Sequence, residues 1–371
     1  MKFAVNTTEI QRTLTKLGGV IPSKSTMPIL ENILFELNGG MLTLTATDLA
    51  ISLTLTIKVD GKEDGRIAIP AKRLMDTMRS LPDTNASFVI DVALNKIRIH
   101  TDTGQYQLTG ESAKDYPQII TFKGEEQFTL DTATLRRIIY RTVFAVSADE
   151  LRPAMMGVLF QASGKELRTV STDGHRLVRV IHMMKSASVL KKDIIVPAKA
   201  LHVVMKSVEE GETVIGVTDT HVKFSFDESV LVSRLIDETY PNYESVIPTD
   251  NTKILKVNRD SMISSIRRVA LYASQTTHQV RFQVEKDSLQ IMAQDMDFGG
   301  EAKETLPCSY SSDPLEIGFN AQYLVDILTH LETPDVIMKF STPTRAGIAS
   351  PAEDGVHDDV VMLVMPVRLT T

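Results

Sequence analysis

One pattern recurs three times along this chain of 371 residues. An alanine is shared by the segments IPAKRLMDTMRSLP, VPAKALHVVMKSV and FNAQYLVDILTHL, at Ala71, Ala198 and Ala321, which are 127 and 123 residues apart. Apolar residues recur at helical intervals in each segment, as at Leu74 and Met78, so each is predicted to be an amphipathic helix. A repeat of constant period indicates a series of similar folding units, and this constrains the fold more than any other feature.

A second helix is predicted at the start of each copy. Asn6, Asp131 and Asn258 open the segments NTTEIQRTLTKL, DTATLRRIIYRTV and NRDSMISSIRRVA, and they are 125 and 127 residues apart. Their side-chain oxygens can accept hydrogen bonds from the free N–H groups of a first helical turn, so each is predicted to be an N-cap. Between the helices the sequence alternates between apolar and polar residues, as in 50–59, which is typical of strands.

An aspartate is a third marker with the same period. Asp48, Asp173 and Asp295 are 125 and 122 residues apart. Three independent markers in one register are strong evidence for a true repeat. We therefore predict an α+β chain of three similar domains, each with two helices and antiparallel sheets: residues 1–122, 128–249 and 250–371.

The composition is that of a globular protein, with 43% hydrophobic and 23% charged residues. No run of about 18 apolar residues occurs, so no membrane span is expected. The N-terminal sequence does not resemble a signal peptide, and a single cysteine, Cys308, is compatible with a reducing compartment. We therefore expect a cytoplasmic protein. A net charge of −7 argues against a protein that coats nucleic acid by bulk electrostatic attraction.

The stretch VSTDGHRLVRV, which begins at Val170, is the most chemically suggestive part of the chain. Its aspartate, Asp173, is common to all copies, so a structural role at a turn between strands is expected. Gly174, His175 and Arg176 have no counterparts in the other two copies. The middle copy therefore carries an additional function, either catalysis or recognition.

Several observations argue against catalysis. The sequence lacks a G-x-S-x-G elbow, a P-loop, a G-x-G-x-x-G motif and an H-E-x-x-H motif. Cys308 has no recognisable partner motif, and the eight histidines show no metal-ligand spacing. A single His175 beside an arginine more often bonds locally or borders a binding surface. We predict that the chain is not an enzyme and has no catalytic residues, no metal site and no cofactor.

The six predicted helices are basic within an acidic chain. They carry a net charge of +8 over 75 residues, which leaves −15 for the other 296. One interpretation is that Lys and Arg favour exposed helix faces. The other is that the helices face phosphates and bind DNA weakly without sequence preference. The scarcity of acidic residues on these helices favours the second interpretation.

The repeat, the P-A-K helices and the motifs TDGHRL, YPNYESVIP and VMPVRL together resemble the β sliding clamp family of bacterial DNA polymerase III, over essentially the whole chain. The resemblance implies the DNA clamp fold in a head-to-tail homodimeric ring of six domains, with twelve helices around duplex DNA and no catalytic activity. It implies that the ring is opened by an ATP-dependent clamp loader and tethers DNA polymerases and repair proteins for processivity. The alternative hypothesis is a non-encircling peptide-binding scaffold of replication or repair.

The resemblance also implies a groove between the second and third domains that binds a short linear peptide motif of partner proteins. The matching positions are Met155, Thr172, Gly174, His175, Arg176, Leu177, Pro241, Val246, Val364, Met365, Pro366, Val367, Arg368 and Leu369. An apolar pocket there would anchor Leu or Phe side chains of the motif, and methionines suit a pocket that accepts many partners. The segment MLVMPVRL can also be an ordinary buried final strand, which is compatible with this role.

The resemblance implies that four basic residues face DNA: Lys24, Arg73, Arg152 and Lys199. Relatives often have Arg where this chain has Lys24, which keeps the charge but not the fork geometry. Pro153 and Ala154 stand where relatives have aromatic residues, so we do not expect base stacking in that loop.

The ring interface of the family joins the first domain to the third. The matching residues are Tyr106, Leu108, Leu271 and Tyr272. A head-to-tail contact between different patches closes into a ring only where the rotation permits. Without the resemblance, Tyr106 and Leu108 would be interpreted as core residues of an alternating strand.

Overall fold

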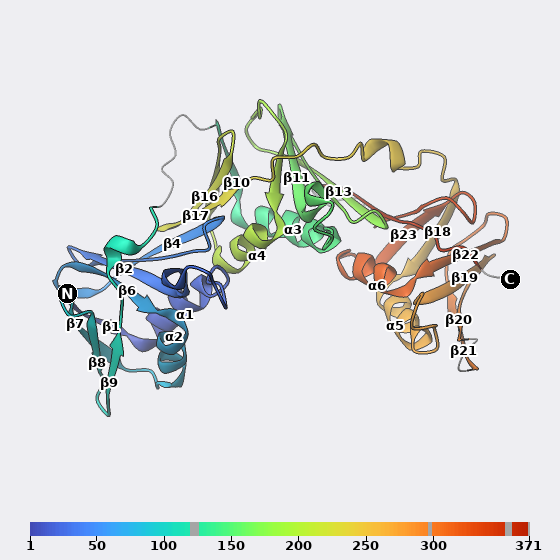
Figure 1. Ribbon diagram of the computed structural model, residues 1–371. Helices are drawn as coiled ribbons and strands as arrows, with labels where there is room; N and C mark the ends of the chain where they lie inside the picture. Colours follow the sequence, from blue (N-terminus) through green and yellow to red (C-terminus); the bar gives the residue numbers. More distant parts are fainter. Residues whose placement is uncertain (119–125, 296–298, 353–357, 370–371) are drawn as a thin grey trace. The chain divides into compact units, whose positions relative to one another are not determined.

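The computed structural model describes residues 1–118, 126–295, 299–352 and 358–369 (Figure 1). Within these residues lie six α-helices and four antiparallel sheets, which confirms the predicted α+β fold with two helices in each copy. None of the described helices has both the length and the apolar character needed to span a membrane. The chain divides into two compact units, residues 1–136 with 199–235 and residues 137–198 with 236–371.

All six helices lie within the segments predicted from the sequence. They are α1 (Thr7–Leu17), α2 (Ala71–Ser80), α3 (Thr132–Thr142), α4 (Ala198–Ser207), α5 (Arg259–Ala270) and α6 (Ala321–Thr329). The predicted N-caps are confirmed. The side chain of Asn6 accepts from the N–H of Thr8 at 2.8 Å, and Asp131 and Asn258 accept from N–H groups of α3 and α5 at 3.1 and 3.0 Å.

The first unit contains two antiparallel sheets. The five-stranded sheet consists, in spatial order, of β5 (Asp60–Glu63), β1 (Lys2–Asn6), β7 (Asn85–Asp91), β8 (Lys96–His100) and β9 (Gln105–Thr109). The eight-stranded sheet consists of β10 (Glu126–Asp131), β15 (Glu212–Val217), β16 (His221–Phe226), β17 (Ser229–Arg234), β4 (Ile51–Lys58), β3 (Met41–Thr47), β2 (Asn32–Asn38) and β6 (Gly65–Pro70).

The second unit is built in the same way. Its eight-stranded sheet consists of β14 (Ile194–Pro197), β11 (Gly157–Ser163), β12 (Glu166–Thr172), β13 (Arg176–Met183), β25 (Asp358–Val364), β24 (Gly347–Pro351), β23 (Asp335–Phe340) and β18 (Lys253–Asn258). Its four-stranded sheet consists of β21 (Gly300–Pro307), β20 (Ser288–Asp295), β19 (Gln279–Glu285) and β22 (Leu315–Asn320).

Both eight-stranded sheets combine strands from two copies of the repeat. In the first unit β17 of the middle copy pairs with β4 of the first copy, from Ser229 opposite Leu55 to Ser233 opposite Ile51. In the second unit β13 of the middle copy pairs with β25 of the third copy. Strands of the middle copy are thus divided between the two compact units, which explains why these units do not coincide with the repeat.

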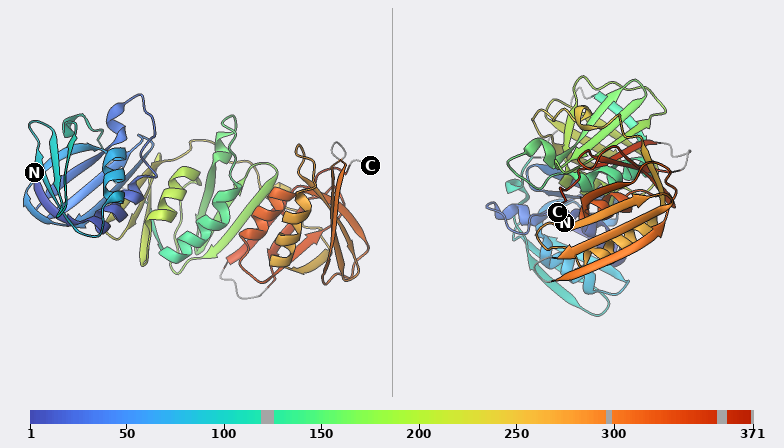
Figure 2. Two further views of the ribbon diagram at one scale, coloured as in Figure 1. Left: turned by 90° about the horizontal axis from the view of Figure 1, so that it is seen from below. Right: turned by 90° about the vertical axis from the view of Figure 1, so that its right-hand side faces the viewer.

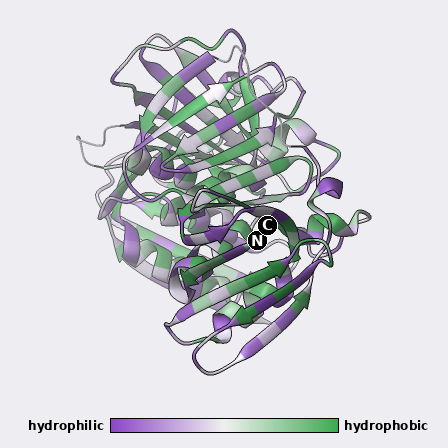
Figure 3. Ribbon diagram, turned by 90° about the vertical axis from the view of Figure 1, so that its left-hand side faces the viewer, coloured by the Kyte–Doolittle hydropathy of each residue, from purple (hydrophilic) through white to green (hydrophobic). Residues whose placement is uncertain are grey.

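Burial follows the period of each element. In β4 the side chains of Ile51, Leu53 and Leu55 are buried, and the residues between them are partly exposed. Figure 3 shows the resulting alternation of hydrophobic and hydrophilic residues along the strands. Helices α1 and α2 pack against each other in the first unit, and α5 and α6 lie side by side in the second (Figures 1 and 2).

Candidate functional site

The aspartate of the repeat forms the same turn in the first two copies. Oδ1 of Asp173 accepts from the N–H groups of His175 and Arg176 at 2.8 and 2.9 Å, between β12 and β13. Asp48 accepts from the N–H groups two and three residues further on, at 3.0 and 2.7 Å. The predicted structural role of these two aspartates is confirmed. In the third copy, the residues that follow Asp295, 296–298, lie outside the described residues.

Gly174 lies in this turn with a φ of 91°. The equivalent Leu49 has a φ of 76°, so this left-handed backbone does not require a glycine. A Cβ atom on Gly174 would lie 3.0 Å from Nη1 of Arg152. The glycine therefore provides space for the Arg152 side chain beside the turn.

Arg176 is held on all sides by other groups of the second unit. Its Nε donates to Asp173 at 3.0 Å, and its Nη2 donates to the carbonyl of Phe144 at 2.8 Å. Its Nη1 lies 2.5 Å from Oδ2 of Asp326 on α6. The guanidinium carbon lies 5.1 Å from the ring centroid of Phe144 and 5.0 Å from that of Tyr323, within the range of cation–π attraction.

His175 is exposed at the surface beside α6. Its ring stacks on that of Tyr323, with centroids 5.7 Å apart and an angle of 15° between the planes. Tyr323 and Asp326 were not predicted as site residues. Both lie on α6, about 150 residues further along the chain, and no local pattern links them to His175 and Arg176.

The C-terminal tail joins the same surface. The N–H of Met365 donates to the carbonyl of His175 at 2.8 Å, directly after β25 ends. The N–H of Val367 donates to the carbonyl of Gly318 on β22 at 2.8 Å. A Cβ on Gly318 would lie 2.8 Å from the backbone carbonyl oxygen of Val367, so the glycine is what permits the backbone of the tail to pack this closely against β22.

These contacts define the turn–tail surface, which comprises Met155, Thr172, Gly174 to Leu177 and Val364 to Leu369. Its base is apolar: Leu177 belongs to a buried cluster that includes Val170, Leu363 and Tyr243. Met155 is buried, whereas Met365 is exposed. The surface thus combines an apolar base with exposed polar and apolar groups, as recognition of a short peptide requires.

The linker before the third copy borders this surface. Tyr240 and Ile247 pack against the apolar cluster beneath it. Pro241 and Val246, which were predicted as groove residues, lie in the same segment and are exposed. Pro241 and Val246 therefore lie in a segment that packs on the apolar cluster, but they are not buried in that cluster themselves.

Asp358 fixes the beginning of β25, the strand that ends at the tail. Its buried side chain accepts from Nε of Arg137 at 2.8 Å and from Nη1 of Arg141 at 2.7 Å, and Nδ1 of His182 lies 2.7 Å away. Burial alone would raise the pKa of Asp358, but the hydrogen bonds from Arg137 and His182 and the two arginine charges hold this pKa below its ordinary value.

Many helix charges are neutralised within the chain. Arg12 and Lys16 of α1 both pair with Glu209, at 2.6 and 2.5 Å, and the hydrogen bond from Lys16 lowers the pKa of that carboxyl. Arg268 of α5 pairs with Glu304 at 2.6 Å. Acidic residues are scarce on the helices themselves, as the sequence shows, but acids from other elements neutralise some of the helix cations. Other helix cations are exposed and have no ion pair among the described residues: Lys72, Arg136, Lys206 and Arg267.

The residues predicted to face DNA have different surroundings. Lys24 is exposed. Lys199 pairs with Asp48 at 2.5 Å. Arg152 pairs with Asp149 at 2.8 Å and donates to the carbonyl of Asp173 at 3.2 Å. Arg152 thus holds its loop against the turn–tail surface, and any contact with DNA would have to compete with these bonds.

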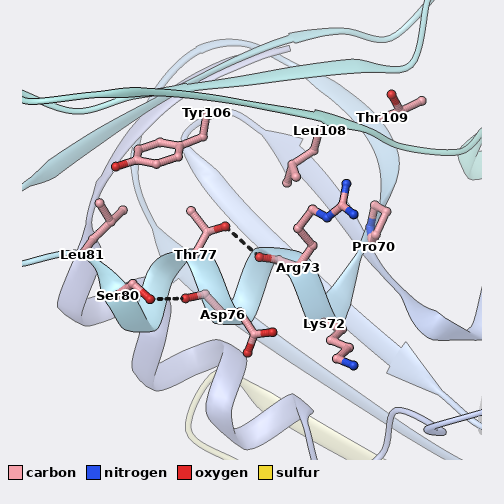
Figure 4. Close-up of a pocket in the computed structure, with 10 residues that line it drawn as sticks. All are labelled: Pro70, Lys72, Arg73, Asp76, Thr77, Ser80, Leu81, Tyr106, Leu108 and Thr109. Carbon is pink, nitrogen blue, oxygen red and sulfur yellow. Dashed lines mark hydrogen bonds between the residues drawn. The ribbon is translucent and has the colours of Figure 1, made fainter.

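A pocket of about 840 Å³ lies between α2 and β9 of the first unit (Figure 4). It is lined by Pro70, Lys72, Arg73, Asp76, Thr77, Ser80, Leu81, Tyr106, Leu108 and Thr109. Figure 4 shows the side chain of Arg73 directed toward Leu108, whereas that of Lys72 points away from β9. Leu108 is buried and Tyr106 partly exposed, so Leu108 does belong to the core and Tyr106 contributes to a surface.

Three family models match the chain in order. They are the N-terminal domain of the DNA polymerase III beta subunit at residues 1–120, its central domain at 129–242 and its C-terminal domain at 244–368. The three domain boundaries predicted from the repeat lie near these limits and remain a prediction.

Similar proteins cover the chain from end to end. The beta sliding clamps of Vibrio cholerae and Salmonella typhimurium are 30% and 31% identical to it, over 100% of each chain. Solved structures of sliding clamps from Bartonella birtlesii and Pseudomonas aeruginosa, both bound to griselimycin, are 30% and 29% identical. They have TM-scores of 0.92 and 0.93 and full coverage of both chains. The chain therefore belongs to the DNA polymerase III beta subunit family, the family of the bacterial beta sliding clamps.

Proposed function

We propose that this sliding clamp encircles duplex DNA as a head-to-tail homodimeric ring and tethers DNA polymerases and repair proteins through its turn–tail surface. A clamp loader would open the ring with ATP. The observation that carries the proposal is the match of all three clamp-domain models, in order, along one chain. We further propose a cytoplasmic protein with no catalytic activity and three domains at 1–122, 128–249 and 250–371.

Two different patches support the proposed dimer contact. The first is the pocket beside β9, an edge strand of its sheet, with Tyr106 and Leu108 in its lining. The second includes Leu271, whose relative exposure is 82%, and Tyr272, whose relative exposure is 47%. Such exposure of large apolar side chains favours a protein interface. A contact between unlike patches closes into a ring when the rotation permits.

The edge strands and their charges are consistent with this contact. β9 and β21 each lie at the edge of their sheet, so each offers unpaired backbone groups for association. The pocket beside β9 contains Arg73, and β21 exposes Glu301. We therefore propose that Arg73 contributes to the dimer contact as well as to the positive charge near DNA.

The DNA contact is proposed to be weak and independent of sequence. Lys24, Arg152 and Lys199 remain proposed DNA-facing residues, and the exposed cations Lys72 and Arg136 are further candidates. Since several other helix charges are already paired, only part of the positive charge is available to phosphates. Retention on DNA would then depend on topology rather than on tight binding.

The test is retention on a nicked circular plasmid. The chain is loaded with an active clamp loader and ATP, and the complex is followed by gel filtration before and after the plasmid is linearised. Release upon linearisation is the expected result, because a ring slides off free ends. Retention on linear DNA would show direct binding and would overturn the encircling mechanism. Failure to load with a loader proven active on another clamp would favour the non-encircling scaffold.

A further inference from the structure

Helix α6 differs in charge from the other five helices. Its single charged residue is Asp326, so it is the one acidic segment among the six that the repeat predicts. The equivalent residue of the first copy, Asp76, pairs with Arg79 of its own helix at 3.8 Å. Asp326 instead reaches Arg176 of the turn–tail surface, at 2.5 Å. The one acidic residue of α6, Asp326, therefore forms an ion pair with Arg176 of the middle copy.

Arg176 is committed to contacts within the protein. Its side chain is only 10% exposed, and each of its three guanidinium nitrogens has an intramolecular acceptor, on Asp173, Asp326 or Phe144. Because its donors are directed inward, Arg176 is better suited to shape the surface than to bind a peptide. Hydrogen bonds between two charged groups are stronger than neutral ones, so the bond to Asp326 is an important part of this arrangement.

We propose that Asp326 is a positioning residue of the turn–tail surface. It fixes Arg176, and through Arg176 it holds the turn that begins at Asp173 against α6. This inference rests on the proposed role of the turn–tail surface in binding partner peptides. It assigns to α6 the function of holding that surface in its binding geometry.

The ion pair between Asp326 and Arg176 is connected to the exposed residues His175 and Met365 through a few direct contacts. The carboxylate of Asp173, which binds Arg176, also fixes the N–H of His175. The ring of His175 stacks on Tyr323, one helical turn before Asp326 on α6. The carbonyl of His175 accepts the N–H of Met365, so the position of the tail depends on the same turn. Loss of the Asp326 carboxylate would leave one end of a nearly buried guanidinium without its acceptor, and the turn would have to adjust.

The test measures peptide affinity of the full chain by fluorescence anisotropy, with a labelled peptide Gln-Leu-Ser-Leu-Phe, which carries the Leu and Phe side chains that an apolar pocket would anchor. We expect Asp326→Ala to weaken binding about tenfold, which corresponds to about 1.4 kcal/mol. Asp326→Glu keeps the negative charge, so its peptide affinity should remain within about threefold of that of the unmodified chain. The matched control is Asp260→Ala on α5, which removes an exposed helix acid paired with Arg259 of the same helix and should leave the affinity unchanged.

A double-mutant cycle separates positioning from direct contact. If Asp326 acts through Arg176, Asp326→Ala should have little further effect in a chain that already carries Arg176→Gln. An equal loss in both backgrounds would overturn the inference, as would unchanged affinity in Asp326→Ala alone. Thermal unfolding of each variant is measured beside the unmodified chain, so that a loss of peptide affinity can be distinguished from a loss of folding. If the unmodified chain does not bind the peptide, the proposed function itself fails, and the inference fails with it.

Discussion

Leu49 and Gly174 occupy equivalent positions of the same turn, in the first and the middle copy, and both have a left-handed backbone, with φ values of 76° and 91°. In L-residues other than glycine this conformation costs about 1–2 kcal/mol. Leu49 has this conformation although the residue is 55% exposed, so burial of its side chain does little to offset the cost. The middle copy has a glycine at this position, and the space it leaves is occupied by the guanidinium of Arg152.

Gly174→Ala should therefore weaken peptide binding in addition to destabilising the fold moderately. The new Cβ would lie 3.0 Å from Nη1 of Arg152, so this flexible side chain must move from its place beside the turn. We expect a several-fold loss of peptide affinity and a loss of roughly 1–2 kcal/mol in the free energy of unfolding. The control is Leu49→Gly, which alters the equivalent turn and should leave peptide affinity unchanged. A similar loss of affinity in both variants would contradict this role for Gly174.

Deletion of Met365–Thr371 should abolish peptide binding and leave the dimer intact. The described part of this segment is tied to His175 and Gly318 through backbone hydrogen bonds, whereas the proposed dimer contact uses other residues, among them Tyr106 and Leu271. Anisotropy measures the first effect and analytical ultracentrifugation the second. Deletion of the last two residues alone is the control and should preserve binding. Undiminished affinity after the longer deletion would remove the tail from the site.

Leu271→Glu should convert the dimer into monomers. The side chain is 82% exposed, so the substitution is tolerated by the isolated chain, whereas burial of a carboxylate in an apolar contact is unfavourable. Sedimentation velocity across a range of concentrations measures the change. Leu151→Glu, at a residue that is 91% exposed in the loop next to Arg152, should leave the dimer unchanged. A dimer that persists in Leu271→Glu would exclude this patch from the ring contact.

Asp358→Asn should strongly destabilise the second unit. The substitution removes the charged partner on β25 that Arg137 and Arg141 share, and Arg141, whose side chain is 5% exposed, keeps only its ion pair with Glu332. Removal of one partner of a buried ion pair typically costs about 3–5 kcal/mol. The neighbouring Asp359, which is 60% exposed and pairs with Arg179, is the control, and Asp359→Asn should cost about 1 kcal/mol or less. Urea unfolding at pH 7 distinguishes the two outcomes.

The same carboxylate determines a pH dependence. Because the pKa of Asp358 is lowered in the folded chain, its contribution to stability is complete above the unfolded pKa of about 3.9 and is lost as the pH falls through the folded value. The unmodified chain should therefore lose stability below about pH 4 more steeply than Asp358→Asn. Equal slopes for the two proteins would show that the carboxylate is not stabilised by its neighbours.

Local patterns predicted the local structure well. The caps at Asn6, Asp131 and Asn258 and the turns at Asp48 and Asp173 depend on residues only two or three positions away, and the sequence shows these directly. The three-fold repeat then led to the fold. Membership of the DNA polymerase III beta subunit family, which its similarity to known clamps confirms, was indicated by the repeat together with motifs such as TDGHRL and VMPVRL. The composition alone did not indicate it.

Contacts between distant segments could not be predicted in this way. Arg176 and Asp326 are 150 residues apart, and Arg137 and Asp358 are 221 apart, so no periodicity connects them. The sequence did contain one indirect signal, the single acidic residue on α6. Helix charge alone also overestimated the positive charge available to DNA, because the position of Glu209 beside α1 depends on the tertiary fold.

The pairing of β17 with β4 and of β13 with β25 has a practical consequence for anyone who wishes to dissect this chain. A cut at a repeat boundary would separate strands that share a sheet and would leave a long central strand as a new edge. Such edges are prone to pair with other chains and aggregate. Fragments should therefore keep both strands of the β17–β4 pair, or both strands of the β13–β25 pair, rather than consist of single repeats.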